Sequence, residues 1–93
     1  MELTFLSDPG HGWLRVPYKL LEDWDIDILI SEHSYRTRAF AYLEEDCDAS
    51  IFINEANKRG FKFSTKYVIT KDFDLYLKSM GNYYRFNNNL RTA

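Results

Sequence analysis

The sequence is poor in cysteine, and Cys47 is the only one among its 93 residues. A single thiol forms no internal disulfide and supplies no second sulfur for a metal cluster, so we expect a reducing compartment. The acids around Cys47 oppose thiolate formation and no histidine is adjacent. We therefore expect a buried structural cysteine rather than a nucleophile.

Long hydrophobic runs are also lacking, because no stretch of eighteen apolar residues occurs. The first ten residues do not contain the basic segment and following apolar stretch of a signal peptide. These two absences predict a protein of the cytoplasm with no membrane partner.

The phosphate-binding patterns Gly-x-x-x-x-Gly-Lys and Gly-x-Gly-x-x-Gly are absent as well. An EF-hand loop that began at Asp46 would need glycine at position 51 and an acid at position 57, where the chain has Ile51 and Asn57. We expect no cofactor and no bound metal ion.

Aromatic side chains, in contrast, are abundant at 17% of residues, within a total of 45% hydrophobic and 28% charged residues. Large rings let a small domain assemble an adequate core. This composition is typical of a globular protein, and the length predicts a single domain over residues 1–93.

The beginning of the chain has the pattern of a β-hairpin. Residues 2–6 and 13–16 are strand-like, and residues 7–12 between them have turn chemistry. A Pro-Gly pair suits the central turn positions, and Asp8 can accept hydrogen bonds from the backbone ahead of it.

Two helices are predicted, a short one over residues 17–24 and the main one over residues 49–59. Asp48 is a suitable N-cap for the main helix, and Gly60 suits the position after its end. The apolar stripe of this helix consists of Ala49, Phe52, Ile53 and Ala56. Residues 26–30 fit either a brief strand or a packed connection.

Further strands are predicted over residues 35–43 and 61–69 from alternating apolar positions. Residues 73–80 fit a strand, with a helix as the alternative; residues 83–86 follow as a strand, and residues 87–93 as a frayed tail. The expected fold is α+β, with a small antiparallel sheet of about four to five strands packed by one main and one short helix.

Charge is distributed unevenly along the chain. Residues 1–48 carry eleven acidic and four basic side chains, whereas residues 49–93 carry three acidic and eight basic ones. The acids cluster at Glu22, Asp23, Asp25 and Asp27 and again at Glu44, Glu45, Asp46 and Asp48. Solvated loops and helix-capping acids explain these clusters, and the alternative is an acidic face that docks on a basic partner.

Asp8 and His11 on the predicted turn are the best candidates for chemistry. A carboxylate and an imidazole can perform acid–base catalysis, but turns often carry such residues, so we favour a capping Asp8 and an exposed His11. His11, His33 and an acid from residues 44–48 would form a metal ligand set, although nothing in their spacing supports one.

The second half of the chain interleaves basic and aromatic residues, as nucleic-acid stacking platforms do. The basic residues are Lys58, Arg59, Lys62, Lys66 and Lys71, and the aromatic ones are Phe61, Phe63 and Tyr67. On one strand, however, Lys62 and Lys66 face away from the rings. A core face with a solvated lysine face is therefore the favoured interpretation.

Two stretches resemble a group of short proteins encoded by bacteriophages and prophages. They are SDPGHGWL at residues 7–14 with VP at residues 16–17, and YLEEDCDA at residues 42–49 with Phe52. The resemblance covers roughly the first 60 residues and implies a phage context, with the cytoplasm of a bacterial host as the location. Small proteins in this context often bind host proteins. Anti-CRISPR and anti-restriction inhibitors are examples, and many use acidic surfaces.

These observations together favour a non-enzymatic binding protein that inhibits or modulates a host protein or protein–nucleic-acid complex, with CRISPR or another defence complex as one such target. The candidate binding residues are Asp8, His11, Trp13, Glu22, Asp23, Asp25, Asp27, Glu44, Glu45 and Asp46, with an exposed Trp13 or tyrosine as anchor. The alternatives are direct nucleic-acid binding by the basic half and, least favoured, an enzyme centred on His11. An unpaired edge strand would also permit a homodimer.

Overall fold

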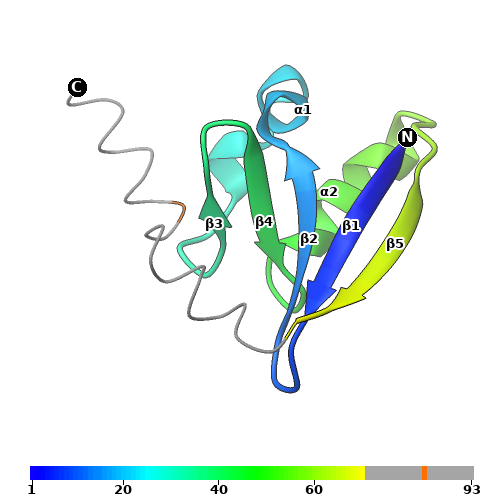
Figure 1. The fold of residues 1–93 in the computed structure, drawn as a ribbon. Coiled ribbons are helices and arrows are strands. Elements are labelled where there is room, and N and C mark those ends of the chain that lie inside the picture. Colours follow the sequence, from blue (N-terminus) through cyan, green and yellow to red (C-terminus); the bar gives the residue numbers. More distant parts are fainter. Residues whose placement is uncertain (71–82, 84–93) are drawn as a thin grey trace.

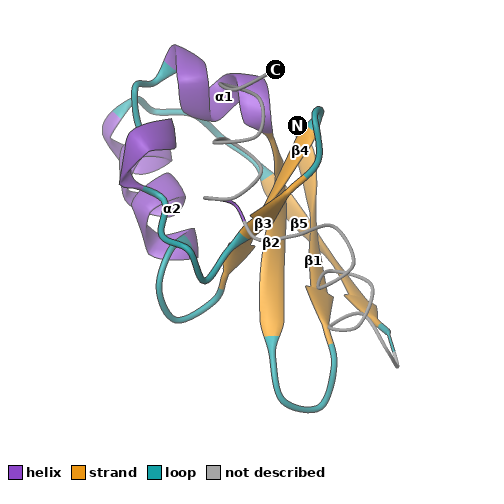
Figure 2. Cartoon of the chain, turned by 90° about the vertical axis from the view of Figure 1, so that its left-hand side faces the viewer, coloured by secondary structure: helices purple, strands orange, loops and turns teal. Residues whose placement is uncertain are grey.

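The computed structural model describes residues 1–70 and Tyr83. The elements are β1 (Glu2–Ser7), β2 (Gly12–Pro17), α1 (Tyr18–Asp23), the 3-10 turn η1 (Asp27–Leu29), β3 (Tyr35–Arg36), β4 (Phe40–Glu44), α2 (Ala49–Lys58) and β5 (Ser64–Ile69). Five strands form one sheet in the order β3-β4-β2-β1-β5 (Figure 1). Both helices lie on the same face of that sheet (Figure 2), so the predicted α+β fold is confirmed.

The sheet is mixed rather than wholly antiparallel. Strands β1 and β2, β2 and β4, and β3 and β4 pair antiparallel as expected, but β1 and β5 run parallel. The difference arises from α2, which carries the chain back along the sheet after β4, so that β5 runs in the direction of β4 and β1.

The β1–β2 hairpin is closed by the turn that the sequence predicts. The Asp8 carboxylate oxygen Oδ1 accepts hydrogen bonds from the backbone N–H of Gly10 at 3.0 Å and of His11 at 2.9 Å. Gly12 begins β2 where a side chain does not fit, since a Cβ there would lie 2.5 Å from Cζ of Phe5. The hairpin therefore depends on both the Asp8 cap and the missing Cβ.

The single strand predicted over residues 35–43 is instead a hairpin of β3 and β4. Its turn is stabilised by side chains, because the Arg36 guanidinium donates to Thr37 O at 3.0 Å and the Phe40 N–H donates to Thr37 Oγ1 at 3.2 Å. Tyr35 consequently lies opposite Tyr42, on the same face, whereas one continuous strand would place them on opposite faces.

Helix α2 begins at the predicted residue and ends one residue earlier than predicted, but its N-cap differs from the expectation. Gly60 has a φ of 66° after the helix end, as a C′ glycine does. Asp48 does not cap α2 with its side chain. Its buried carboxylate instead accepts hydrogen bonds from Ser31 N at 3.0 Å, from Ser31 Oγ at 2.7 Å and from Ser34 Oγ. The Asp48 carboxylate therefore bonds to donors of the connection at residues 31–34, rather than to the free N–H groups at the start of α2.

The main core lies between the helices and the sheet. Phe52 of α2 and Leu21 of α1 are fully buried there, together with Val16 and Leu43 of the sheet. Residues 26–30 prove to be a packed connection rather than a strand, with η1 between the buried Ile26 and Ile30. Ile53, which the sequence places in the apolar stripe, is 38% exposed.

A second, smaller cluster consists of Leu6, Trp13 and Tyr42, and Val68 packs against it. Trp13 is 2% exposed, so the expectation of an exposed anchor at this position is wrong. Trp13 is the second residue of β2, and strand alternation points it away from Leu14, which belongs to the main core.

The last part of the chain can be compared with prediction only in part. Strand β5 begins at Ser64, three residues later than expected. The elements predicted at residues 73–80 and the tail at residues 87–93 lie outside the described residues. Tyr83 is buried, with helical rather than extended backbone, and its hydroxyl donates to Asp27 O at 2.8 Å.

Candidate functional site

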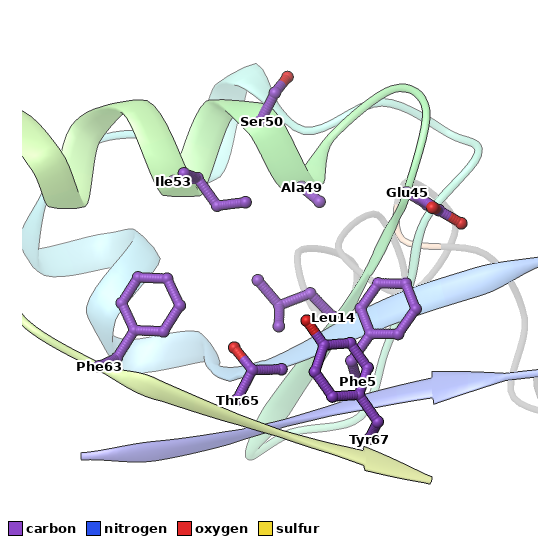
Figure 3. Close-up of a pocket in the computed structure, with 9 residues that line it drawn as sticks. All are labelled: Phe5, Leu14, Glu45, Ala49, Ser50, Ile53, Phe63, Thr65 and Tyr67. Atoms are coloured by element: carbon purple, nitrogen blue, oxygen red, sulfur yellow. The ribbon is translucent and has the colours of Figure 1, made fainter. Parts of the chain in front are cut away.

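A groove runs between helix α2 and strands β1 and β5, and its volume is about 340 Å³ (Figure 3). We call it the α2–β5 groove, and its lining consists of Phe5, Leu14, Glu45, Ala49, Ser50, Ile53, Phe63, Thr65 and Tyr67. This volume lies within the range typical of sites that take a small molecule or a large side chain.

The sheet side of the groove follows directly from strand register. Phe5 of β1 is paired with Leu14 of β2 on one side and with Tyr67 of β5 on the other, so these three side chains share one face. The Phe5 and Tyr67 rings lie 5.7 Å apart between centroids. Tyr67 is nevertheless 75% exposed, which leaves most of its ring available to a ligand.

The helix side is formed by Ala49 and Ile53, which lie one turn apart on α2. The small Ala49 side chain leaves space that a larger residue would fill. Figure 3 shows Glu45 at the end of the groove where α2 begins and Phe63 at the opposite end. The groove therefore combines apolar walls with one carboxylate at an end, which suits an apolar group that carries or adjoins a positive charge.

The loop that contains Glu45, residues 44–48, is held in a fixed conformation and is called the acidic loop below. Oε2 of Glu44 accepts hydrogen bonds from Asp46 N at 3.0 Å and Cys47 N at 2.8 Å, and Glu45 N donates to Gly12 O at 3.0 Å. Glu44 therefore has a structural role, whereas Glu45 and Asp46 are exposed and available to a partner.

Cys47 is exposed on the acidic loop, so the prediction of a buried structural cysteine is wrong. Cys47 precedes α2, and the buried apolar residues of that helix begin only at Ala49. A hydrogen bond with Glu44 and the charges of the surrounding acids raise the pKa of the Cys47 thiol. The thiol therefore stays protonated near neutral pH and is a weak nucleophile.

The Asp8–His11 pair lies on the β1–β2 turn with the arrangement expected of a structural pair. His11 Nδ1 is 3.6 Å from Asp8 Oδ1, and the imidazole is exposed and stacks on Trp13 with centroids 5.6 Å apart. The same Asp8 oxygen caps the turn. Within residues 1–70 and Tyr83, no group of three or more His, Cys, Asp or Glu side chains is placed to hold a metal ion, and this includes His11 and His33.

The candidate binding residues fall at two opposite ends of the sheet. The Asp8–Trp13 segment forms the turn before β2 and the start of that strand, and the acidic loop lies at the end of the antiparallel β4. Because Trp13 pairs with Glu44 and Glu45 N donates to Gly12 O, these two segments lie together. Helix α1 follows the other end of β2 (Figure 1), which places its residues Glu22 and Asp23 at the end of the sheet away from the acidic loop. Asp25 and Asp27 come after α1, and Asp27 begins η1. Two separate acidic regions therefore replace the single face considered from the sequence.

The basic and aromatic residues of the second half are not arranged as a free stacking platform. Phe61 and Phe63 pack against the core, where Phe61 meets Trp24 with centroids 5.1 Å apart. Arg59 Nε donates to Glu55 at 3.0 Å and its guanidinium lies over the Trp24 ring. Lys62 and Lys66 are exposed, and Lys71 lies outside the described residues.

The residues that sequence reasoning missed are Ile53, Phe63, Thr65 and Tyr67 of the groove. The signal was present, because alternating apolar positions from residue 61 onward define a strand face. That face was assigned to the core. The sequence does not show that β5 is the outermost of the described strands on that side, or that α2 covers it incompletely.

Comparison of the chain with protein-family models, with curated proteins and with solved structures yields no match. Neither helix in the described part of the chain has the length and apolar character required to cross a membrane.

Proposed function

We propose that this chain is a small non-enzymatic protein that binds a host protein and inhibits or modulates it. The proposed class of target is host defence complexes that act against phages, including CRISPR complexes. The observation that carries the proposal is the α2–β5 groove with exposed acids at one end. An apolar recess beside exposed charge provides the two components of a specific protein contact.

The groove supplies an anchor position. Tyr67 is 75% exposed and Ile53 is 38% exposed beside a recess of about 340 Å³, so a large apolar side chain of a partner would bury both on binding. Tyrosine, as at position 67, is enriched among the few interface residues that contribute most of the binding free energy.

The acidic loop supplies steering. Glu45 and Asp46 are exposed at the end of the groove, and their charge favours a basic surface such as one that binds nucleic acid. Residues 7–14 and 42–49, the two stretches that resemble phage-encoded proteins, both flank this end of the sheet, so the proposed contact surface coincides with them.

Direct binding of nucleic acid is the weaker candidate. It needs aromatic rings beside free cations, but Phe61 and Phe63 are packed against the core and Arg59 is paired with Glu55. Lys62 and Lys66 remain exposed, and the capture experiment described next also measures their contribution to nucleic-acid binding.

The test is affinity capture from bacterial lysate at low and moderate salt, with and without nuclease treatment, using matched bait variants. Glu45→Lys combined with Asp46→Lys reverses the acidic loop without touching Glu44, and Ile53→Glu alters the groove. Glu22→Lys combined with Asp23→Lys is the control, because it makes the same charge change at the opposite end of the sheet.

We expect one host protein to be captured by the wild type and by the control variant, and to be lost with both site variants. The affinity of that host protein, once purified, is then measured for each variant. Capture that is insensitive to both site variants would refute the proposed surface. Recovery of nucleic acid alone, lost with salt and with neutral residues at Lys62 and Lys66, would favour the alternative.

A further inference from the structure

Strand β5 is an edge strand in the described part of the chain, and its outer side has no strand partner there. Exposed edges are usually protected by charge, proline, short length or a bulge. The six residues of β5 contain one charge, Lys66, and no proline. Two large apolar side chains are exposed on this strand, Tyr67 at 75% and Ile69 at 86%.

The backbone groups of β5 divide into two sets. Ser64 N donates to Met1 O at 3.0 Å and Thr70 N donates to Ser7 O at 2.8 Å, so the even-numbered residues bond to β1. Backbone groups of successive strand residues point to opposite sides. Thr65, Tyr67 and Ile69 therefore direct their N–H and C=O groups to the outer edge.

We infer that β5 pairs antiparallel with β5 of a second copy of this chain, with Tyr67 opposite Tyr67 about a two-fold axis perpendicular to the sheet. The occupant is a second copy because this register is self-complementary. It places Thr65 opposite Ile69 of the other copy, so every outward-facing residue meets an outward-facing residue and exchanges both hydrogen bonds.

The side chains agree with this register. Thr65, Tyr67 and Ile69 share the helix-facing side of the sheet, so the paired residues lie on the same face in both copies. Lys66 lies opposite Val68, which keeps the two lysines from facing each other directly. Tyr67 and Ile69, the two exposed apolar residues of the strand, become partly covered by the second copy.

The dimer would also place two grooves beside the same axis, since Thr65 and Tyr67 line the α2–β5 groove. A dimeric partner, or one with two equivalent contacts, would then bind both grooves at once. The dimer does not depend on the proposed function, because it needs only β5 and not the acidic loop.

The first test is sedimentation of the full chain over micromolar to millimolar concentrations. We expect a dimer in the wild type and a monomer in Tyr67→Pro, because proline removes an outward N–H and no hydrogen bond to β1. Tyr67→Glu serves as a second variant that keeps the N–H, and its two like charges should raise the dimer Kd by roughly tenfold or more. A monomeric wild type, or a dimer unchanged in both variants, would overturn the inference.

The second test fixes the register by disulfide trapping in a Cys47→Ser background. Paired residues at a hydrogen-bonded position have Cα atoms about 5.5 Å apart, within disulfide range, so Tyr67→Cys should cross-link to itself. Thr65→Cys is the matched control that should not cross-link alone but should cross-link when mixed with Ile69→Cys. Self-linking of Thr65→Cys as efficient as that of Tyr67→Cys would exclude this register.

These tests separate the two proposals. Lysines at Glu45 and Asp46 should abolish capture of the host protein and leave the dimer intact. Tyr67→Glu should dissociate the dimer, and a dimer that persists beside failed capture would count against the proposed function alone.

Discussion

Replacement of Asp48 by alanine should destabilise the domain more than any other change in the acidic loop. The carboxylate is 1% exposed and accepts hydrogen bonds from Ser31 N, Ser31 Oγ and Ser34 Oγ. The alanine variant leaves these three donors without their acceptor. A buried donor without a partner costs about 1–3 kcal/mol, and we expect a total loss of about 3–5 kcal/mol after partial relaxation of the hydroxyls.

That loss is a large part of the 5–15 kcal/mol typical of a small domain. In urea it should lower the unfolding midpoint by roughly 2–3 M, measured by far-ultraviolet circular dichroism and tryptophan fluorescence. Asp48→Asn should lie between wild type and Asp48→Ala, since the amide oxygen still accepts hydrogen bonds from two of the donors.

The matched control is Asp46→Ala, in the same loop but exposed, which should change stability by less than about 0.5 kcal/mol. A double-mutant cycle with Ser34→Ala should give a coupling of about 1 kcal/mol or more. The interpretation of Asp48 as the link between the 31–34 connection and α2 fails if Asp48→Ala costs less than about 1 kcal/mol.

Three further predictions concern other parts of the molecule. Tyr83→Phe should lower the free energy of unfolding by about 1–2 kcal/mol in the same urea assay, because the hydroxyl that donates to Asp27 O is lost. Gly12→Ala should cost about 1–3 kcal/mol by overpacking against Phe5, whereas Gly10→Ala should be nearly neutral, its nearest neighbour being 4.0 Å away. Cys47 should react slowly with a disulfide reagent at neutral pH, and the pH midpoint of that rate should lie above that of an ordinary exposed cysteine, as its pKa is raised.

Local signals in the sequence were sufficient for elements that are determined by near neighbours. The β1–β2 turn follows from Asp8 and the Pro-Gly pair, and the end of α2 follows from Gly60. Both are formed by contacts within a few residues, which sequence patterns report well.

Contacts between distant segments could not be predicted in the same way. The role of Asp48 depends on Ser31 and Ser34 seventeen and fourteen residues earlier, and sequence spacing does not show which donors enclose a carboxylate. The β3–β4 turn lacks glycine and proline and is stabilised instead by the guanidinium of Arg36, so alternation alone predicted one strand.

The candidate site was predicted in part for the same reason. The acids at residues 44–46 and the Asp8 turn are visible in the sequence, and the structure brings them to one end of the sheet. Whether Tyr67 is in the core or exposed depends on the position of β5 in the sheet, which is set by the crossover through α2 rather than by any local pattern.

The parallel pairing of β1 with β5 affects how the protein can form during synthesis. The first strand to leave the ribosome is completed by the last described strand, so its outer edge stays open until residues 64–69 have been made. Pairings between such distant segments form slowly, and the open edge of β1 can pair with β5 of a neighbouring chain instead. Slow translation or high expression should therefore favour exchanged or aggregated chains, while fast completion of β5 closes the β1 edge within one molecule.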